Sequence, residues 1–171
     1  MDKAPTSITD LLTDSRPTIS FEFFPPKDAA GFDTLRTTFS ELQKFNPDFI
    51  SVTYGAMGSN QESSLAVVKE FASQIPTIAH LTCIGATKAT ITALLDSYSA
   101  FGVAGILALR GDIPKTFEGN PLGDFTSAND LITHIDGSNF EIGVSAFPEK
   151  HPESPSLAHD IEVLKLKQES G

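Results

Sequence analysis

The stretch Ser20-Phe21-Glu22-Phe23-Phe24-Pro25-Pro26 places one carboxylate in an otherwise apolar strand, and two prolines then end that strand. Alternation along a strand puts Glu22 and Phe24 on one face and Phe21 and Phe23 on the other. An unpaired buried charge is costly, so Glu22 must be paired, protonated or used in chemistry. This segment alone slightly favours a structural Glu that bonds a neighbouring strand, and the segments that follow reverse this preference.

The rest of the chain alternates between strand-like and helix-like segments. Runs rich in Ile, Val, Phe, Thr or Ala predict strands at about 18–24, 47–54, 77–83, 104–110 and 141–147. Apolar residues at helical spacing predict helices at 32–42, 65–72, 91–98 and 126–135, with a last one from about Ser156. Residues 1–17 form a polar lead-in with one helical turn near Ile8, and residues 18–171 form a single domain.

Five consecutive strand–helix units imply parallel strands with right-handed crossovers. They fit an open doubly wound sheet or an incomplete (β/α)₈ barrel with about five of its eight units. In both architectures the working loops follow the C-terminal ends of the strands. The chain concentrates Gly, Pro and polar residues at these positions, namely Glu22, Thr53-Tyr54-Gly55, His80, Arg110-Gly111-Asp112 and Phe147-Pro148-Glu149. A site is therefore expected at this edge of the sheet.

Composition narrows the classes of function. The chain has 171 residues, with 12 Lys and Arg against 22 Asp and Glu, a net charge of -10. This balance argues against binding to nucleic acid or to an anionic membrane. No apolar run has the length of a membrane span, and the first residues lack the apolar segment of a signal peptide. A single cysteine, Cys83, allows no internal disulfide and suits the cytoplasm. The four His lack the spacing of metal ligands, so no metal site is expected.

The residues after the second and third strands have two interpretations. Thr53 to Ala56 offer a hydroxyl, an aromatic ring and a glycine that lets a ligand approach the backbone, but a plain strand-to-turn transition explains them too. His80 near the end of the third strand is more often a hydrogen-bonded core residue than a ligand-binding group. Cys83 is expected to be a buried, unreactive side chain.

Charged residues also follow the fourth and fifth predicted strands. Arg110 offers planar donors for phosphate or carboxylate, and Gly111 and Asp112 follow it directly, although a surface Arg–Asp pair at a turn gives the same pattern. The prolines on either side of His151 form a stiff loop that would fix the imidazole, or serve only as a rigid connection. Neither a dinucleotide-binding glycine motif nor a P-loop is present.

In order along the chain come the segments SFEFFPPK, DFISVTYGA, AHLTCIGAT, ILALRGDIP and FPEKHPE, followed by SLAHDIEVLKLK. Together they resemble the methylenetetrahydrofolate reductase family from about Thr18 onward. The resemblance implies a (β/α)₈ barrel that holds FAD at the C-terminal ends of its strands. It also implies reduction of 5,10-methylenetetrahydrofolate to 5-methyltetrahydrofolate by NADH or NADPH, in one-carbon metabolism that feeds methionine biosynthesis.

The resemblance also assigns roles to individual residues. Glu22 matches the family's general acid, which protonates N10 of the folate so that the ring opens and the reduced flavin can deliver hydride. An apolar neighbour such as Phe24 favours the protonated form that this role needs. Asp112 matches a catalytic carboxylate near the flavin and the pterin. Thr53 matches a position that faces the nicotinamide. Alternate use of one flavin face by both substrates implies ping-pong kinetics.

The positions that match FAD contacts of the family are Thr53, Tyr54, Ala56, His80, Arg110, Gly111, Asp112, Ala128, Phe147, His151, Asp160 and Lys167. Three of the chain's residues depart from the family pattern. Phe147 stands where many members have Tyr, so a hydroxyl contact to FAD is lost. Val163 and Leu166 stand where some relatives carry polar contacts to the cofactor.

Length is the largest departure, because a complete barrel needs about 200–250 residues. An open half-barrel would expose both edge strands and its inner face. We therefore expect self-association or a missing C-terminal half, and impaired reductase activity in the chain alone. A non-catalytic truncated paralogue or fragment that binds flavin or a partner chain is the alternative, and an unrelated barrel enzyme acting on phosphate-bearing substrates is a third. The residues do not decide between NADH and NADPH.

Overall fold

The computed structural model describes residues 7–54, 61–112 and 123–171, and within them five parallel strands form one sheet in the order β1-β2-β3-β4-β5. The strands are β1 (Ser20–Phe23), β2 (Phe49–Val52), β3 (Thr77–Thr82), β4 (Gly105–Leu109) and β5 (Glu141–Val144). A doubly wound sheet reverses its strand order, whereas this one runs in a single direction. The sheet is therefore part of a (β/α) barrel, and the predicted fold class is confirmed.

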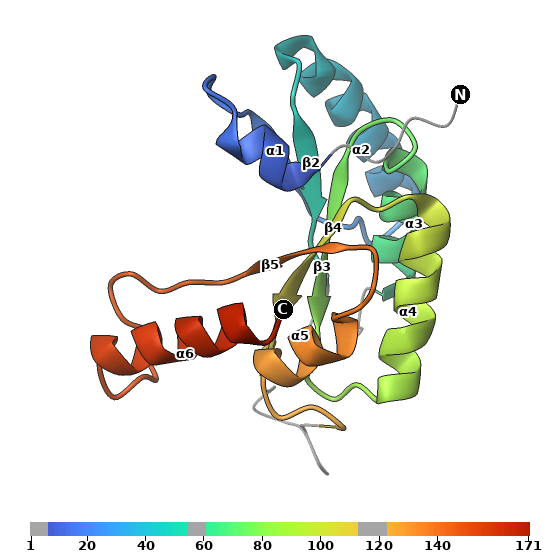
Figure 1. Cartoon of the computed structure of the whole chain (residues 1–171). Helices are drawn as coiled ribbons and strands as arrows, with labels where there is room; N and C mark the ends of the chain where they lie inside the picture. The colour runs from blue at the N-terminus through green and yellow to red at the C-terminus, as the bar shows by residue number, and fades with distance from the viewer. Residues whose placement is uncertain (1–6, 55–60, 113–122) are drawn as a thin grey trace.

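Helices connect successive strands and stand on one side of the sheet. They are α2 (Ala29–Leu42) with the short η1 (Gln43–Phe45), α3 (Gln61–Phe71), α4 (Lys88–Phe101) and α5 (Ala128–Ile135), and α6 (Leu157–Glu169) follows β5. In Figure 1, α2, α3 and α4 lie to the right of the strands, α1 (Ile8–Thr13) lies to the left, and α6 extends away at the lower left. Right-handed crossovers between neighbours in a sheet of constant direction place successive helices on the same face.

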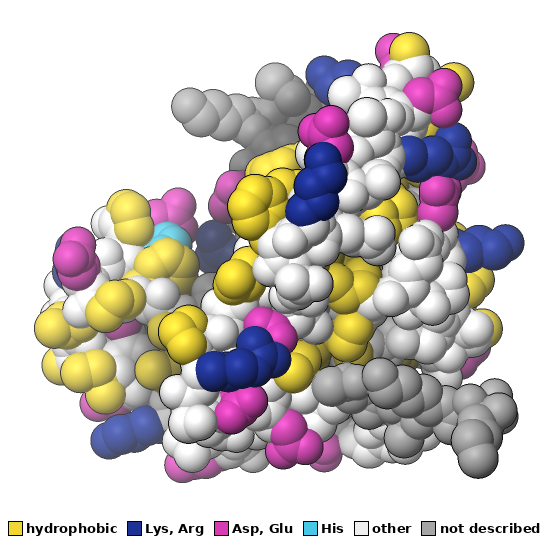
Figure 2. Space-filling model, turned by 90° about the horizontal axis from the view of Figure 1, so that it is seen from above, with side chains coloured by type: hydrophobic (Ala, Val, Ile, Leu, Met, Phe, Trp, Pro, Cys, Tyr) yellow, Lys and Arg dark blue, Asp and Glu magenta, His cyan; other side chains and the backbone are white. Residues whose placement is uncertain are grey.

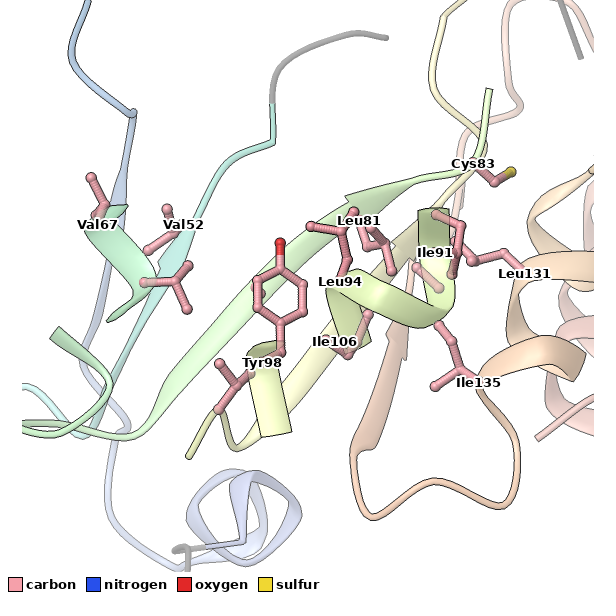
Figure 3. Close-up of a cluster of buried hydrophobic side chains, with 14 of the residues drawn as sticks. Val52, Val67, Leu81, Cys83, Ile91, Leu94, Tyr98, Ile106, Leu131 and Ile135 are labelled. Atoms are coloured by element: carbon pink, nitrogen blue, oxygen red, sulfur yellow. The ribbon is translucent and has the colours of Figure 1, made fainter. Parts of the chain in front are cut away.

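The hydrophobic core fills the space between the sheet and these helices. Figure 3 shows Ile91, Leu94 and Tyr98 of α4 packed against Leu81 of β3 and Ile106 of β4. A second part of this core is aromatic: the rings of Phe23, Phe39 and Phe71 pack together, with the last two stacked at 4.2 Å between centroids. Phe23 thus faces the helices, so Glu22 faces the other side, as alternation in β1 predicts.

Cross-strand register defines this other side, which we call the open face. One row of neighbours runs across all five strands, through Glu22, Ser51, Ile78, Gly105 and Glu141. The row passes from near the end of β1 to the first residue of β5. This stagger is the shear that a barrel requires when its strands tilt.

Several elements are shorter than predicted, for reasons visible in their hydrogen bonds. The strand expected from residue 18 begins at Ser20, because the N–H of Ile19 is bonded to the side chain of Asp48. The strand expected to reach residue 147 ends at Val144, because the carbonyl of Ser145 accepts a bond from Lys167 Nζ at 2.6 Å. The helix expected from residue 126 begins at Ala128, because Ser127 is its N-cap.

Helix α1 lies within the segment expected to be a polar lead-in. Its N-cap, Ser7, donates a hydrogen bond to Glu141 Oε1 at 2.5 Å, and the backbone N–H of Thr9 donates to Oε2 at 2.9 Å. The lead-in is therefore tied to the start of β5. No helix in the described part of the chain is long and apolar enough to cross a bilayer.

Candidate functional site

A cavity of about 680 Å³ opens at the C-terminal ends of β4 and β5. The loop after β5, the first turn of α5 and the side of α6 from His159 to Lys167 line its other sides. Its lining includes nine of the residues predicted to contact a cofactor, namely Tyr54, Arg110, Gly111, Asp112, Ala128, Phe147, His151, Asp160 and Lys167. Cavities of this size are typical of small-molecule sites.

Arg110 and Gly111 form the edge of the cavity that follows β4. The carbonyl of Arg110 accepts a hydrogen bond from the N–H of Ile84 at 2.9 Å, which ties this turn to the end of β3. Gly111 has a φ of +85°, and a Cβ there would lie 2.8 Å from Ile84 Cγ2 and 3.0 Å from Thr82 Cβ. Only glycine fits this tight position. The guanidinium of Arg110 reaches Glu153 at 3.4 Å in a mostly exposed pair, so it can exchange this partner for a ligand anion.

His151 is held in place from three directions. Its backbone N–H donates to Asp160 Oδ2 at 2.9 Å, and its Nδ1 accepts the N–H of Glu153 at 3.1 Å. Since Nδ1 is an acceptor, the neutral imidazole carries its proton on Nε2. Phe147 packs edge-on against the ring, with 4.5 Å between centroids. In place of a hydroxyl contact, Phe147 therefore supports the His151 ring.

Lys167 and Asp160 bring opposite charges from α6 to the same cavity. Lys167 is buried, and its ammonium donates to the backbone and the hydroxyl of Ser145. Burial lowers the pKa of Lys167, while the charge of Asp160 works against this shift. Burial raises the pKa of Asp160, but the hydrogen bond from His151 and the neighbouring contacts outweigh it, so the pKa is lower than usual. The carboxyl group of Asp160 is therefore charged near neutral pH.

The N-terminus of α5 completes the cavity opposite these charges. Ser127 caps the helix, and its hydroxyl accepts from the N–H of Asp130 at 3.3 Å. The Asp130 carboxylate in turn accepts from the N–H and the hydroxyl of Thr126 at 2.8 and 2.6 Å. Ala128, the first residue of the helix, lines the cavity. The positive end of a rigid helix dipole is thus directed at the space that a ligand would occupy.

The remaining predicted residues lie elsewhere. Glu22, Thr53 and His80 are not among the residues that line the cavity, and Ala56 lies outside the described residues. Glu22 and His80 face one another on the open face, with Oε2 and Nε2 3.5 Å apart. The apolar surroundings expected for Glu22 are not formed in the described chain, because its side chain is 47% exposed and Phe24 is 69% exposed.

Sequence reasoning missed several polar groups in the cavity, and Thr82 is the one without a hydrogen-bond partner in the described part of the chain. Thr82 lines the cavity and is 8% exposed, and its hydroxyl has no hydrogen-bond partner among the described residues. Buried hydroxyls are normally bonded, so this one can serve a ligand. Alternation along β3 from His80 to Thr82 was the signal that could have identified it.

Cys83 behaves as predicted. It is fully buried, its Sγ lies 3.5 Å from the carbonyl of Ser127, and burial raises the pKa of its thiol to about 11. No group of His, Cys, Asp and Glu within residues 7–54, 61–112 and 123–171 is arranged to hold a metal ion.

Comparison with known proteins finds relatives that all carry the name of one enzyme. "5,10-methylenetetrahydrofolate reductase" of Escherichia coli is 36% identical over 156 residues, which are 90% of this chain and 51% of that protein. "Methylenetetrahydrofolate reductase 2" of Schizosaccharomyces pombe is 37% identical over 96% of this chain and 28% of its own length. A rice protein, "Probable methylenetetrahydrofolate reductase (NADH)", is 31% identical over 99% of this chain and 31% of its own length.

The chain thus spans about half the length of the bacterial relative and about a third of the two eukaryotic ones. The family model described as "Methylenetetrahydrofolate reductase" matches residues 7–171. On this match and on the identity to these relatives, the chain belongs to the methylenetetrahydrofolate reductase family.

Proposed function

We propose that this chain carries the FAD site and the acid of a reductase that converts 5,10-methylenetetrahydrofolate to 5-methyltetrahydrofolate with NADH or NADPH as donor. The observation that supports this most strongly is the cavity at β4 and β5, because nine residues predicted from the family as FAD contacts line this one space. The name of the rice relative supports NADH as the donor. When bound, FAD supplies the hydride that reduces the folate.

The residues of the cavity fit a dinucleotide with a diphosphate. Arg110, Lys167 and the N-terminus of α5 provide positive charge for the phosphates, and Gly111 lets the backbone approach a flat ring closely. The hydroxyl of Thr82, which is unpartnered among the described residues, adds a buried donor at the same edge. Asp112 is exposed at the mouth of the cavity, where a carboxylate can stabilise a cationic folate intermediate.

Glu22 lies on the open face at the C-terminal end of β1, on the strand edge where substrates of barrel enzymes bind. There it can donate its proton to N10 of the folate and open the five-membered ring. Its partial exposure in the described chain leaves room for a substrate to cover it.

The first test is the visible spectrum of the purified chain after it is mixed with FAD and desalted. A retained and shifted flavin band is expected, and loss of all flavin on desalting would contradict the proposal. Arg110→Met should weaken FAD binding by about 10-fold or more, because a charged hydrogen bond to phosphate is lost. Arg36→Met is the matched control: Arg36 also forms an exposed ion pair, with Glu70, but on α2 far from the cavity lining. It should change FAD affinity less than about twofold.

A second candidate function, binding of a partner chain, is supported by exposed apolar side chains on α6. Leu157, Ile161, Leu164 and Leu166 are each 40% to 50% exposed, and Figure 2 shows hydrophobic side chains gathered at the left, where α6 lies. In the described part of the chain, β1 and β5 also pair on one side only. Light scattering is expected to show self-association that Leu164→Glu weakens. A monomer at all concentrations would rule out self-association.

A further inference from the structure

Three polar side chains from neighbouring strands meet on the open face. Glu22 of β1 is the register partner of Ser51 of β2, and His80 of β3 lies one position further along on the same face. Ser51 Oγ donates toward Glu22 Oε2 at 3.5 Å, and His80 Nε2 lies 3.5 Å from the same oxygen. One oxygen of the carboxyl group therefore has two neighbours, and neither contact is tight.

The surroundings of His80 make Glu22 its polar partner. His80 is outside the lining of the cavity, and its side chain is 11% exposed. Its own register partner on β4 is the apolar Leu107. Burial lowers the pKa of His80, and among the described residues the charge that opposes this shift is that of Glu22. The imidazole is thus neutral near pH 7.

A neutral imidazole suits a carboxyl group that must change its protonation state. With its proton on Nε2, His80 donates to the Glu22 carboxylate. With its proton on Nδ1, the bare Nε2 accepts from the protonated acid. The hydroxyl of Ser51 can likewise donate or accept. A lysine at this position could serve only the carboxylate, because an ammonium has no acceptor.

We propose that His80 is a positioning residue that holds the Glu22 carboxyl group on the open face in both of its protonation states. The inference deepens the proposed function, since it rests on Glu22 being the acid of the reaction.

The tautomer of His80 provides the first test and needs no variant in the measured sample. In a ¹⁵N-labelled chain at pH 7.5, the nitrogen shifts of His80 are assigned by comparison with His80→Asn. The Nε2–H tautomer is expected, because Nε2 must donate to the carboxylate. The Nδ1–H tautomer at this pH would overturn the inference.

A titration of the same signals tests the pairing. Because the Glu22 charge raises the pKa of His80, Glu22→Gln is expected to lower that pKa by about half a pH unit. Glu153→Gln is the matched control, since it also removes a carboxylate, but one that faces Arg110. It should leave the His80 titration unchanged. Equal shifts in both variants would overturn the inference.

These measurements use neither flavin nor folate, so they are independent of the test of the proposed function. A chain with the coupled pair that retains no FAD contradicts the proposed function and leaves the pairing in place. A chain that retains FAD without the coupling contradicts the role of His80 alone.

Discussion

Glu22 and Glu141 are two carboxylates in one cross-strand row on the open face, and the protein holds them very differently. Glu141, the first residue of β5, accepts bonds from the Ser7 hydroxyl at 2.5 Å and from the N–H and hydroxyl of Thr9 at 2.9 and 3.4 Å. Within the described part of the chain, Glu22, near the end of β1, has two contacts at 3.5 Å.

The difference follows from the end of the sheet at which each residue lies. In (β/α) barrels the N-terminal ends of the strands serve stability, and the C-terminal ends serve chemistry. The bonded carboxylate of Glu141 fixes α1 to the sheet. Under the proposed function, the loosely held carboxyl group of Glu22 is the acid of the reaction. One side chain type would then have two uses on one face.

If the open face contributes little to folding, a substitution on it should cost less stability than one that faces the helices. Two neighbouring residues in β4 test this. Ile106 is fully buried against the helices, while Leu107 points to the open face and is partly exposed. Ile106→Ala should lower the free energy of unfolding by about 2–5 kcal/mol, and Leu107→Ala by roughly 1 kcal/mol. Urea denaturation measures both. Equal losses would mean that the open face is covered and would break the comparison.

The two carboxylates can be compared directly by the same substitution. Glu141→Gln should lower the free energy of unfolding by about 1 kcal/mol, because charged hydrogen bonds to α1 are lost. Glu22→Gln should change it by less than about 0.5 kcal/mol. The measurement is urea denaturation at pH 7, with hydrogen exchange of α1 amides as a local readout. A larger loss for Glu22→Gln would show that Glu22 is the structural carboxylate.

The smallest expected effect is a pH dependence. Burial raises the pKa of Glu141, but the hydrogen bonds from Ser7 and Thr9 outweigh it and hold the pKa below its ordinary value. A carboxyl group whose pKa is depressed by folding stabilises the protein above its unfolded pKa, and this contribution is lost as pH falls through the folded pKa. The stability gap between the native chain and Glu141→Gln should therefore close between about pH 5 and pH 3. A gap independent of pH would assign the effect of the variant to packing.

The sequence predicted the five units, their parallel order and the face of Glu22, because each depends on local periodicity. It left two architectures open, since the order of strands in a sheet depends on contacts between distant segments. Exact ends were also missed where a side chain replaces a ladder bond, as Asp48 does at Ile19 and Lys167 does at Ser145.

Nine of the predicted site residues line one cavity, but the position of Glu22 and His80 outside its lining was not foreseen. Whether His80 points to the cavity or to Glu22 depends on the stagger of the strands, which no single segment encodes. The role of Glu141 was missed for the same reason, because its partners lie at the other end of the chain.

The consecutive order of the strands has a consequence for synthesis. Each strand pairs with the one made just before it, so the sheet can grow unit by unit as the chain leaves the ribosome. The contacts of α1 are the exception, since Ser7 and Thr9 are 134 and 132 positions from Glu141. Pulsed hydrogen exchange during refolding should show the amides of α1 protected after those of β3 and β4. A helix that is made before all five strands is thus expected to dock only after the fifth.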